Sequence, residues 1–263
     1  MHPEDKLTEN HQNEVEPTIN EEEDLSHSDK LVGIYTAPSE TFQKISYEKP
    51  KHSDWLIPLA VILVVVIASF IIKMNNPEIK DKMMSAQVEK QEKAIDEMVK
   101  QGKLDPDKAE QQKESVNKMM TGPLAMVIGS LGIIVNYCLV FFVLAGIIFL
   151  FARFVFKGSG TYTHALIANS LTNYIAMIGV IIALILSIYM VKPFNDVNAN
   201  NFAGLKGFGG FGLNLIDIFG IWANIVYIIG LKKLFKLNSA IGIGIVVFVI
   251  WILLKYVGYA FAS

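Results

Sequence analysis

The chain has 263 residues, of which 52% are hydrophobic, and its formal net charge is −2. This composition gives no reason to expect a nucleic-acid partner, and the single cysteine, Cys138, excludes both a disulfide within the chain and a thiolate metal cluster. Of the 25 acidic residues, only Asp196 and Asp217 lie beyond residue 122. The sequence therefore divides into a solvated half with one apolar stretch, 1–122, and a compact apolar half, 123–263.

Residues 1–30 are predicted to form an acidic disordered tail. The first 29 residues contain ten acidic side chains against one lysine and almost no aliphatic side chains. Such a segment cannot bury enough apolar surface to offset the entropy of ordering it.

Residues 31–54 are predicted to form an interfacial amphipathic segment. Its apolar side chains fit one side of a short, broken helix: Leu31, Ile34, Tyr35, Phe42 and Ile45. Pro38 suits the first turn of the second piece. A segment of this kind fits the membrane surface ahead of a first span. The alternative is an ordinary juxtamembrane linker.

Five apolar stretches predict membrane-spanning helices, so the predicted fold class is an all-α membrane protein. A helix needs roughly 20 apolar residues to cross a hydrocarbon layer about 30 Å thick. The stretches cover about residues 55–72, 124–152, 165–191, 213–231 and 240–262. The first is the shortest, but it contains no charged residue. We therefore expect a multi-pass protein embedded in a lipid bilayer.

Residues 73–122 are predicted to form a soluble helical hairpin between the first and second spans. Ten lysines and ten acidic residues occupy this segment. One narrow apolar stripe recurs at helical spacing: Met84, Val88, Ile95 and Val99. Gly102 ends the first helix, and Asp105 with Pro106 begins the second. A methionine-rich surface that binds a partner is the alternative.

The distribution of basic residues predicts the orientation. With the amino terminus inside, eight basic residues flank the inner ends of the spans: Lys44, Lys49, Lys51, Arg153, Lys157, Lys232, Lys233 and Lys236. The third loop, outside, has only Lys192 and Lys206, although the ten lysines of the first loop conflict with the rule. We predict a cytoplasmic amino terminus and a carboxyl terminus on the other side.

Polar side chains within the spans should face one another, because facing lipid is costly. They include Asn136 in the second span, Asn173 in the third, and Asp217 and Asn224 in the fourth. Their small, polar stripes favour helix packing over the alternative of a lined transport path.

Asp217 and Lys255 are predicted to form a structural ion pair. Antiparallel fourth and fifth helices would place both near the outer face of the membrane, where Lys255 is also close enough to the surface to snorkel.

His164 is the only histidine beyond residue 52. We therefore expect no catalytic residues, no metal site and no cofactor.

Several stretches carry a resemblance to a known family. They are LNLIDIFGIWANIVYIIGLKKLFKLNSAIGIGIVVFVIWILL at 213–254, KGSGTYTHALIANSLTNY at 157–174, and LVGIYTAPSETFQKI before a Trp-Leu-Ile-Pro sequence at the first span. With a five-span layout and a Lys-, Gln- and Glu-rich insert after the first span, they resemble bacterial members of the Yip-type integral membrane family, over about residues 31–262.

The resemblance implies five spans, a cytosolic amino terminus and no catalytic residues. Eukaryotic members are associated with Golgi and endoplasmic-reticulum membranes, Rab GTPases and vesicle traffic, whereas bacterial members have no settled role. Lysine supplies 22 of the 23 basic residues, which hints at a bacterial source and hence the inner membrane. We expect a non-enzymatic, membrane-organising or partner-binding adaptor with an unknown protein partner or a second copy of the chain. A small-solute transporter or channel subunit is the alternative.

Overall fold

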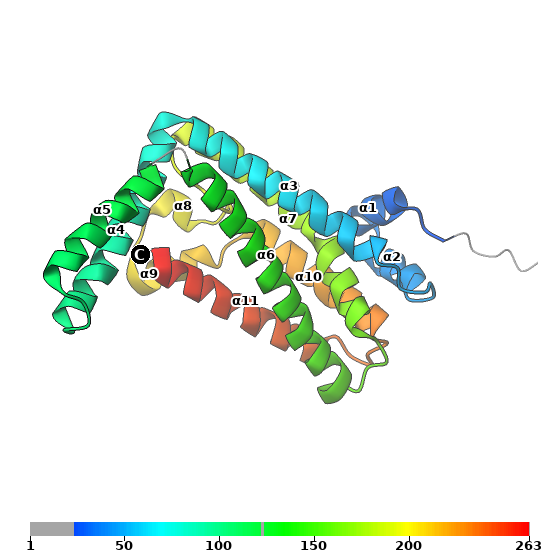
Figure 1. Ribbon diagram of the computed structural model, residues 1–263. Coiled ribbons are helices and arrows are strands. Elements are labelled where there is room, and N and C mark those ends of the chain that lie inside the picture. The colour runs from blue at the N-terminus through cyan, green and yellow to red at the C-terminus, as the bar shows by residue number, and fades with distance from the viewer. Residues whose placement is uncertain (1–23, 122–123, 263) are drawn as a thin grey trace, which may run out of the picture.

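The computed structural model describes residues 24–121 and 124–262, and every regular element named within them is a helix (Figure 1). Most of the predicted acidic tail, residues 1–23, lies outside the described residues. The end of that predicted tail differs from the structure, because helix α1 already begins at His27.

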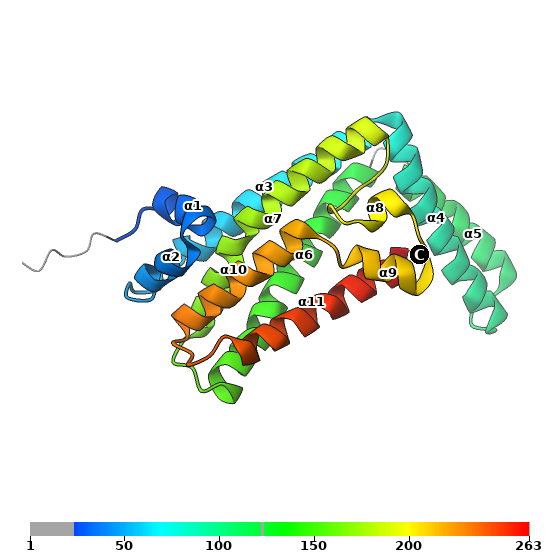
Figure 2. The same ribbon diagram turned by 180° about the vertical axis from the view of Figure 1, so that it is seen from behind.

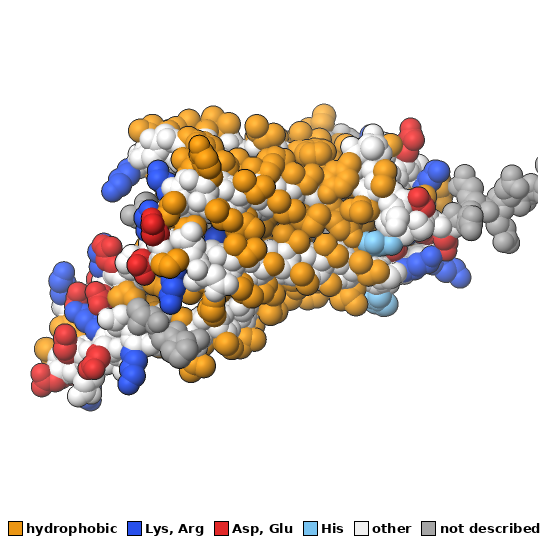
Figure 3. All heavy atoms as spheres, turned by 90° about the horizontal axis from the view of Figure 1, so that it is seen from above, with side chains coloured by type: hydrophobic (Ala, Val, Ile, Leu, Met, Phe, Trp, Pro, Cys, Tyr) orange, Lys and Arg blue, Asp and Glu red, His pale blue; other side chains and the backbone are white. Residues whose placement is uncertain are grey.

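Four helices are long and apolar enough to cross a membrane. They are α3 (Ser53–Asn75), α6 (Ala125–Leu150) with its π-helical continuation η1 (Phe151–Val155), α7 (Tyr162–Met190) and α11 (Ile241–Ala262). At 1.5 Å per residue, even the shortest of them exceeds about 30 Å. Figure 3 shows a broad apolar face along these helices, with charged side chains gathered toward both ends. The chain is an all-α, multi-pass membrane protein.

The predicted fourth span is divided in the structure. Residues Gly207–Asn214 form the short helix α9, and α10 runs from Ile218 to Leu234, so the predicted start at residue 213 falls in a different helix. The break has a local cause. Asp217 is extended and its carboxylate accepts a hydrogen bond from the Gly220 N–H, which makes Asp217 the N-cap of α10. With 17 residues, α10 is about 25 Å long.

Helix α7 is the centre of the bundle. It packs against α3, α10, α6 and α1, and Figures 1 and 2 show it lying between α3 and α10. Its first half is buried almost continuously from Ala165 to Ile175. Gly179, farther along α7, permits a close approach to Phe219 of α10, whose Cβ would lie 3.0 Å from an added Cβ. The small side chains of α7 therefore serve helix packing.

Helices α1 (His27–Thr36) and α2 (Pro38–Ile45) fold back onto one end of the bundle. Ser26 and the side chain of Asp29 form a capping box that starts α1. Ile34 and Phe42, on the apolar side of this pair, are fully buried, and α2 packs on α10. The predicted broken helix is present, but much of its apolar side faces protein.

Helices α4 (Pro77–Lys100) and α5 (Pro106–Thr121) lie side by side beyond the opposite end of the bundle (Figure 2). The Asn76 side chain accepts from the first two N–H groups after Pro77, which begins α4. Gly102, with φ 67°, adopts the left-handed conformation that ends this helix. An ion pair of 2.7 Å joins Lys113 of α5 to Asp96 of α4.

The successive long helices run in alternating directions, so the connecting segments gather at two ends (Figure 1). The basic end comprises α1, α2 and the segments 46–52, 151–161 and 235–240, and there the Ser159 N–H donates to the Phe235 carbonyl at 2.9 Å. The distal end comprises α4, α5, the segment 191–217 with α8 (Asn200–Ala203) and α9, and the end of α11.

Candidate functional site

The distal end holds a three-residue charged cluster. Lys255 Nζ lies 2.8 Å from Asp217 Oδ2 and also pairs with Asp196 Oδ2. The structure thus brings together the two residues for which the sequence predicts an ion pair, and it adds a second carboxylate. One positive charge faces two negative charges, and Asp217 is almost completely buried. Asp196 and Lys255 line a cavity of about 450 Å³ at this end.

The sequence prediction does not include Asp196, although a signal for it exists. It is one of only two acidic residues in the apolar half of the chain, and it precedes the short helices that return toward α10. An isolated backbone bridge between Asn198 and Asp217 joins the start and the end of this return. Asp196 contacts Lys255 from an irregular segment. Because that segment has no helical periodicity, the spacing of its residues does not predict this contact.

The polar side chains at the start of α10, Asp217 and Asn224, form hydrogen bonds within their own helix. Asp217 accepts from the Gly220 N–H at 2.9 Å, and Asn224 Nδ2 donates to the Gly220 carbonyl at 2.8 Å. These bonds fix the first turns of α10 and turn the Asn224 side chain back along the helix.

A central cavity of about 230 Å³ lies between α6, α7, α10 and α11, and Asn173 and Asn224 both line it. Tyr137 of α6 donates to Asn173 Oδ1 at 3.1 Å. Tyr227 of α10 also lines the cavity, and it is buried. The cavity and the distal charged cluster adjoin, because Trp251 and Leu254 line both this cavity and the one beside Lys255.

Asn136 does not join this group, which corrects the expectation that the intramembrane polar residues face one another. It lines a separate cavity of about 460 Å³, whose wall includes Met84 of α4 and Met119 of α5. The reason is helical geometry. Adjacent residues point about 100° apart on a helix, so Tyr137 faces Asn173 while Asn136 faces elsewhere.

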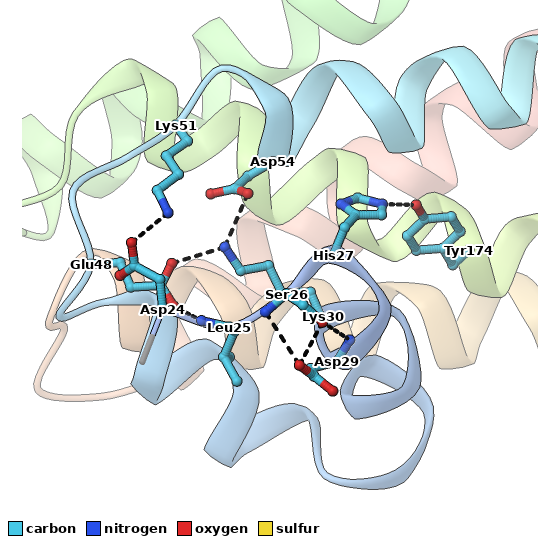
Figure 4. Close-up of polar contacts among 10 residues, drawn as sticks. All are labelled: Asp24, Leu25, Ser26, His27, Asp29, Lys30, Glu48, Lys51, Asp54 and Tyr174. Atoms are coloured by element: carbon cyan, nitrogen blue, oxygen red, sulfur yellow. Dashed lines mark hydrogen bonds and ion pairs between the residues drawn. The ribbon is translucent and has the colours of Figure 1, made fainter. Parts of the chain in front are cut away.

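A polar network at the basic end joins α1 to the start of α3 (Figure 4). Lys30 is 1% exposed, and its Nζ lies 2.9 Å from Glu48 Oε2 and 3.0 Å from Asp54 Oδ1. His27 Nε2 and the Tyr174 hydroxyl of α7 share a hydrogen bond. These contacts tie the amino-terminal helices to the bundle through charged groups that are shielded from solvent.

Burial perturbs the titration of the groups in α1. Loss of solvent lowers the pKa of His27 below its ordinary value of 6.5, Asp54 acts in the opposite sense, and Lys30 lowers it further. Burial also raises the pKa of Tyr35, whose hydroxyl donates to the Tyr174 carbonyl at 2.5 Å. Neutral forms of both side chains therefore suit the folded state.

The acidic composition of residues 1–30 gives no indication that Lys30 is buried. Lys30 precedes Ile34 by four residues, so the two share a face of α1, and this spacing places a lysine on an apolar side. Lys73, near the end of α3, is a second buried lysine that the sequence does not predict. Its Nζ donates to the Phe194 carbonyl at 2.5 Å and fastens α3 to the segment that leads to α8.

No group of three or more His, Cys, Asp or Glu side chains suited to a metal ion occurs within residues 24–121 and 124–262. The charged clusters at both ends instead combine lysine with carboxylates, an arrangement that fixes one segment to another.

The family described as the Yip1 domain matches residues 32–261 of the chain. This range takes in nearly all of the described helices, from α1 to α11. No curated protein and no solved structure matches the chain.

Proposed function

The chain belongs to the Yip1 domain family, and on that premise we propose that it is a non-enzymatic adaptor that binds a partner protein at the basic end of its bundle. In this proposal α10 is a fifth membrane crossing, the amino terminus is cytoplasmic, and the protein resides in a bacterial inner membrane. The alternating directions of α3, α6, α7, α10 and α11 support five crossings.

The clustering of cations supports the proposed orientation. Six of the eight flanking basic residues lie in α2 and the connecting segments of the basic end, and Lys232 and Lys233 lie in the last turn of α10, which ends there. Positive charge of this kind favours the cytoplasmic side. The ten lysines of the segment 73–122 lie at the other end and conflict with this rule, in which the ten acidic residues of the same segment count for little.

One observation carries the adaptor role: α1 and α2 form a folded platform outside the long apolar helices, fixed by the buried Lys30 network. The platform exposes Val32 of α1 and Lys44 of α2, and the segment that follows α2 exposes Tyr47 and Lys49. Aromatic side chains are enriched at protein–protein interfaces, and exposed cations favour a partner of opposite charge. We infer a cytosolic partner with an acidic surface.

Site-specific photocrosslinking tests this proposal. A photoreactive amino acid at position 47 should give a discrete protein adduct in intact membranes, and the matched probe at Tyr189, exposed at the far end of α7, should not. Reversal of charge by Lys44→Glu and Lys49→Glu should abolish the adduct. An adduct that survives charge reversal, or that forms equally at position 189, would contradict a partner surface at the basic end.

Cysteine labelling tests the topology. In a Cys138→Ala background, Ser46→Cys and Ser239→Cys should react only after the membrane is permeabilised, whereas Ser115→Cys should react from outside. Labelling of all three from one side would refute the five-crossing arrangement.

The central cavity favours a second candidate, a small-solute transporter or channel subunit, because it adjoins the open cavity at the distal end. Saturable solute flux in proteoliposomes of the pure protein would replace the adaptor proposal with this one.

A further inference from the structure

The ends of η1 and α10, with the loops that follow them, carry basic residues without counter-ions. They are Arg153, Lys157, Lys232, Lys233 and Lys236. None of these side chains forms an ion pair with another residue in the described part of the chain. The two acidic residues beyond residue 122 lie at the distal end, where both pair with Lys255. The positive charge of these two loops is therefore available to a ligand.

The two loops form one surface. An added Cβ on Gly158 would lie 2.7 Å from a side-chain atom of Leu237 and 2.9 Å from one of Phe235, so the backbones approach closely. Lys157 precedes Gly158, and Lys236 lies between Phe235 and Leu237. The two lysines therefore extend from neighbouring stretches of backbone.

Arg153 is fixed at the same surface. Its Nη1 donates to the Gly158 carbonyl at 3.0 Å, which holds the guanidinium beside the loop of Lys157. A guanidinium has further N–H donors in a planar fork that matches the oxygens of a phosphate, and ammonium groups add positive charge to such a site. The combination of Arg153 with the two lysines suits a phosphate group.

The backbone conformation of the two lysines is unusual for this residue type. Lys157 and Lys236 have φ of 56° and 52°, in the left-handed region. The Leu237 N–H donates to the Lys232 carbonyl at 2.9 Å, in a helix-ending motif whose left-handed residue is usually glycine. Lysine in this conformation typically loses more stability than a cation gains at a helix C-terminus. Stability alone therefore does not account for lysine at both positions.

Exposed apolar side chains flank the cations. Phe154 and Val155 lie between Arg153 and Lys157 in the sequence and are 68% and 59% exposed, and Ile241, at the start of α11, is 75% exposed. The acyl chains of a lipid can cover such side chains, whereas a soluble phosphate cannot. Basic surfaces at the ends of membrane helices are also where lipid headgroups lie. Both features favour a phospholipid over a soluble anion.

We propose that Arg153, Lys157 and Lys236 bind the phosphate of an anionic phospholipid, whose acyl chains lie against Phe154 and Ile241. The two lysines in the last turn of α10 add to the positive charge that favours an anionic lipid over a zwitterionic one. This lipid surface shares no residue with the proposed partner surface of α1 and α2, so either can exist without the other.

Native mass spectrometry of the purified full-length protein tests the site with two probes that have the same acyl chains, dioleoylphosphatidylglycerol and dioleoylphosphatidylcholine. The wild type should bind the anionic probe in preference to the zwitterionic one. Lys157→Gly with Lys236→Gly should weaken binding of the anionic probe at least about tenfold, because each cation near an anionic lipid surface contributes about a fivefold change in affinity. Lys157→Arg with Lys236→Arg keeps both charges and should bind like the wild type.

Two controls separate the site from charge in general and from folding. Lys192→Gln with Lys206→Gln removes the same charge from exposed positions at the distal end and should bind like the wild type. Thermal unfolding without added lipid should show the double glycine variant to be at least as stable as the wild type, because glycine adopts the left-handed conformation without strain. Weaker lipid binding by that variant would then not result from unfolding.

Three results would overturn the proposal: equal binding of the two lipids by the wild type, unchanged binding of the anionic probe in the double glycine variant, or an equal loss in the distal control. If no lipid preference is found and a photoreactive amino acid at position 157 crosslinks to an acidic protein, these cations would be assigned to a protein partner instead.

Discussion

Replacement of Lys30 by methionine should release α1 and α2 from the basic end of the bundle. Lys30 is the partner of both Glu48 and Asp54, whose side chains are 9% and 5% exposed. Methionine fills much of the same volume but leaves two carboxylates without a cation. The expected effect is therefore electrostatic, with little change in packing.

The magnitude follows from the burial. Removing one partner of a buried ion pair costs about 3–5 kcal/mol, because the remaining charge is left in a medium that solvates it poorly. At about 1.4 kcal/mol per tenfold change, this corresponds to roughly a 10²- to 10⁴-fold increase in the opening of α1 and α2. The long apolar helices should stay folded, since the network lies at their end.

Hydrogen–deuterium exchange of the purified protein measures this opening directly. Amides of residues 27–45 should exchange faster in Lys30→Met, while amides of α7 should not change. Lys44→Met removes an exposed lysine of α2 and is the control. Neutralising the orphaned acids by Glu48→Gln and Asp54→Asn in the Lys30→Met background should restore much of the protection. Equal exchange in Lys30→Met and Lys44→Met would refute this account of the buried network.

Three other predictions concern the remaining contacts. Asp217→Asn should change stability by less than about 1 kcal/mol, since asparagine still caps α10 and Lys255 keeps its second carboxylate, but Asp217→Ala should cost about 1–2 kcal/mol; equal midpoints for the two variants in thermal unfolding would contradict the capping role. Gly230→Ala should push α2 away from α10, because the new Cβ would lie 2.7 Å from a phenyl ring of α2, whereas Gly132→Ala meets no atom within 4 Å; faster exchange of α2 in the first variant alone is expected. Lowering the pH below 6.5 should destabilise the α1 contact, because the lowered pKa of His27 favours its neutral form in the folded state. The protection of α1 amides, taken relative to their intrinsic exchange rates at each pH, should decrease between pH 7 and pH 5, and a decrease of the same size in His27→Gln would assign the effect to other groups.

The apolar stretches predict much of the helical architecture because burial in lipid requires only length and lack of charge. The boundaries of α3, α7 and α11 fall within three residues of the predicted ones. The start of α10 differs more, since hydropathy does not change at the break. There the chain turns at Asp217. Its carboxylate accepts a hydrogen bond from the Gly220 N–H, which has no carbonyl partner within α10.

The polar contacts were harder to predict, because they depend on loops and on which face of a helix meets a neighbour. The proximity of Asp217 and Lys255 follows from antiparallel helices of known length. Asp196 comes from an irregular segment and Lys30 from an acidic one, and neither pattern indicates burial. Asn136 and its neighbour Tyr137 point in different directions around the helix axis, and composition does not show which direction faces another helix.

In the proposed arrangement of five crossings, the short length of α10 has a consequence for the membrane itself. About 25 Å of helix is several ångströms less than an average hydrocarbon layer. The segment 191–217 lies beside the last turns of α11, where the Tyr259 hydroxyl donates to the Leu205 carbonyl at 3.3 Å. On that side of the protein the lipid headgroups must lie closer to the membrane centre in order to contact the polar backbone. The surrounding leaflet should therefore be thinned. Bilayers made from shorter acyl chains should accommodate the protein with less deformation.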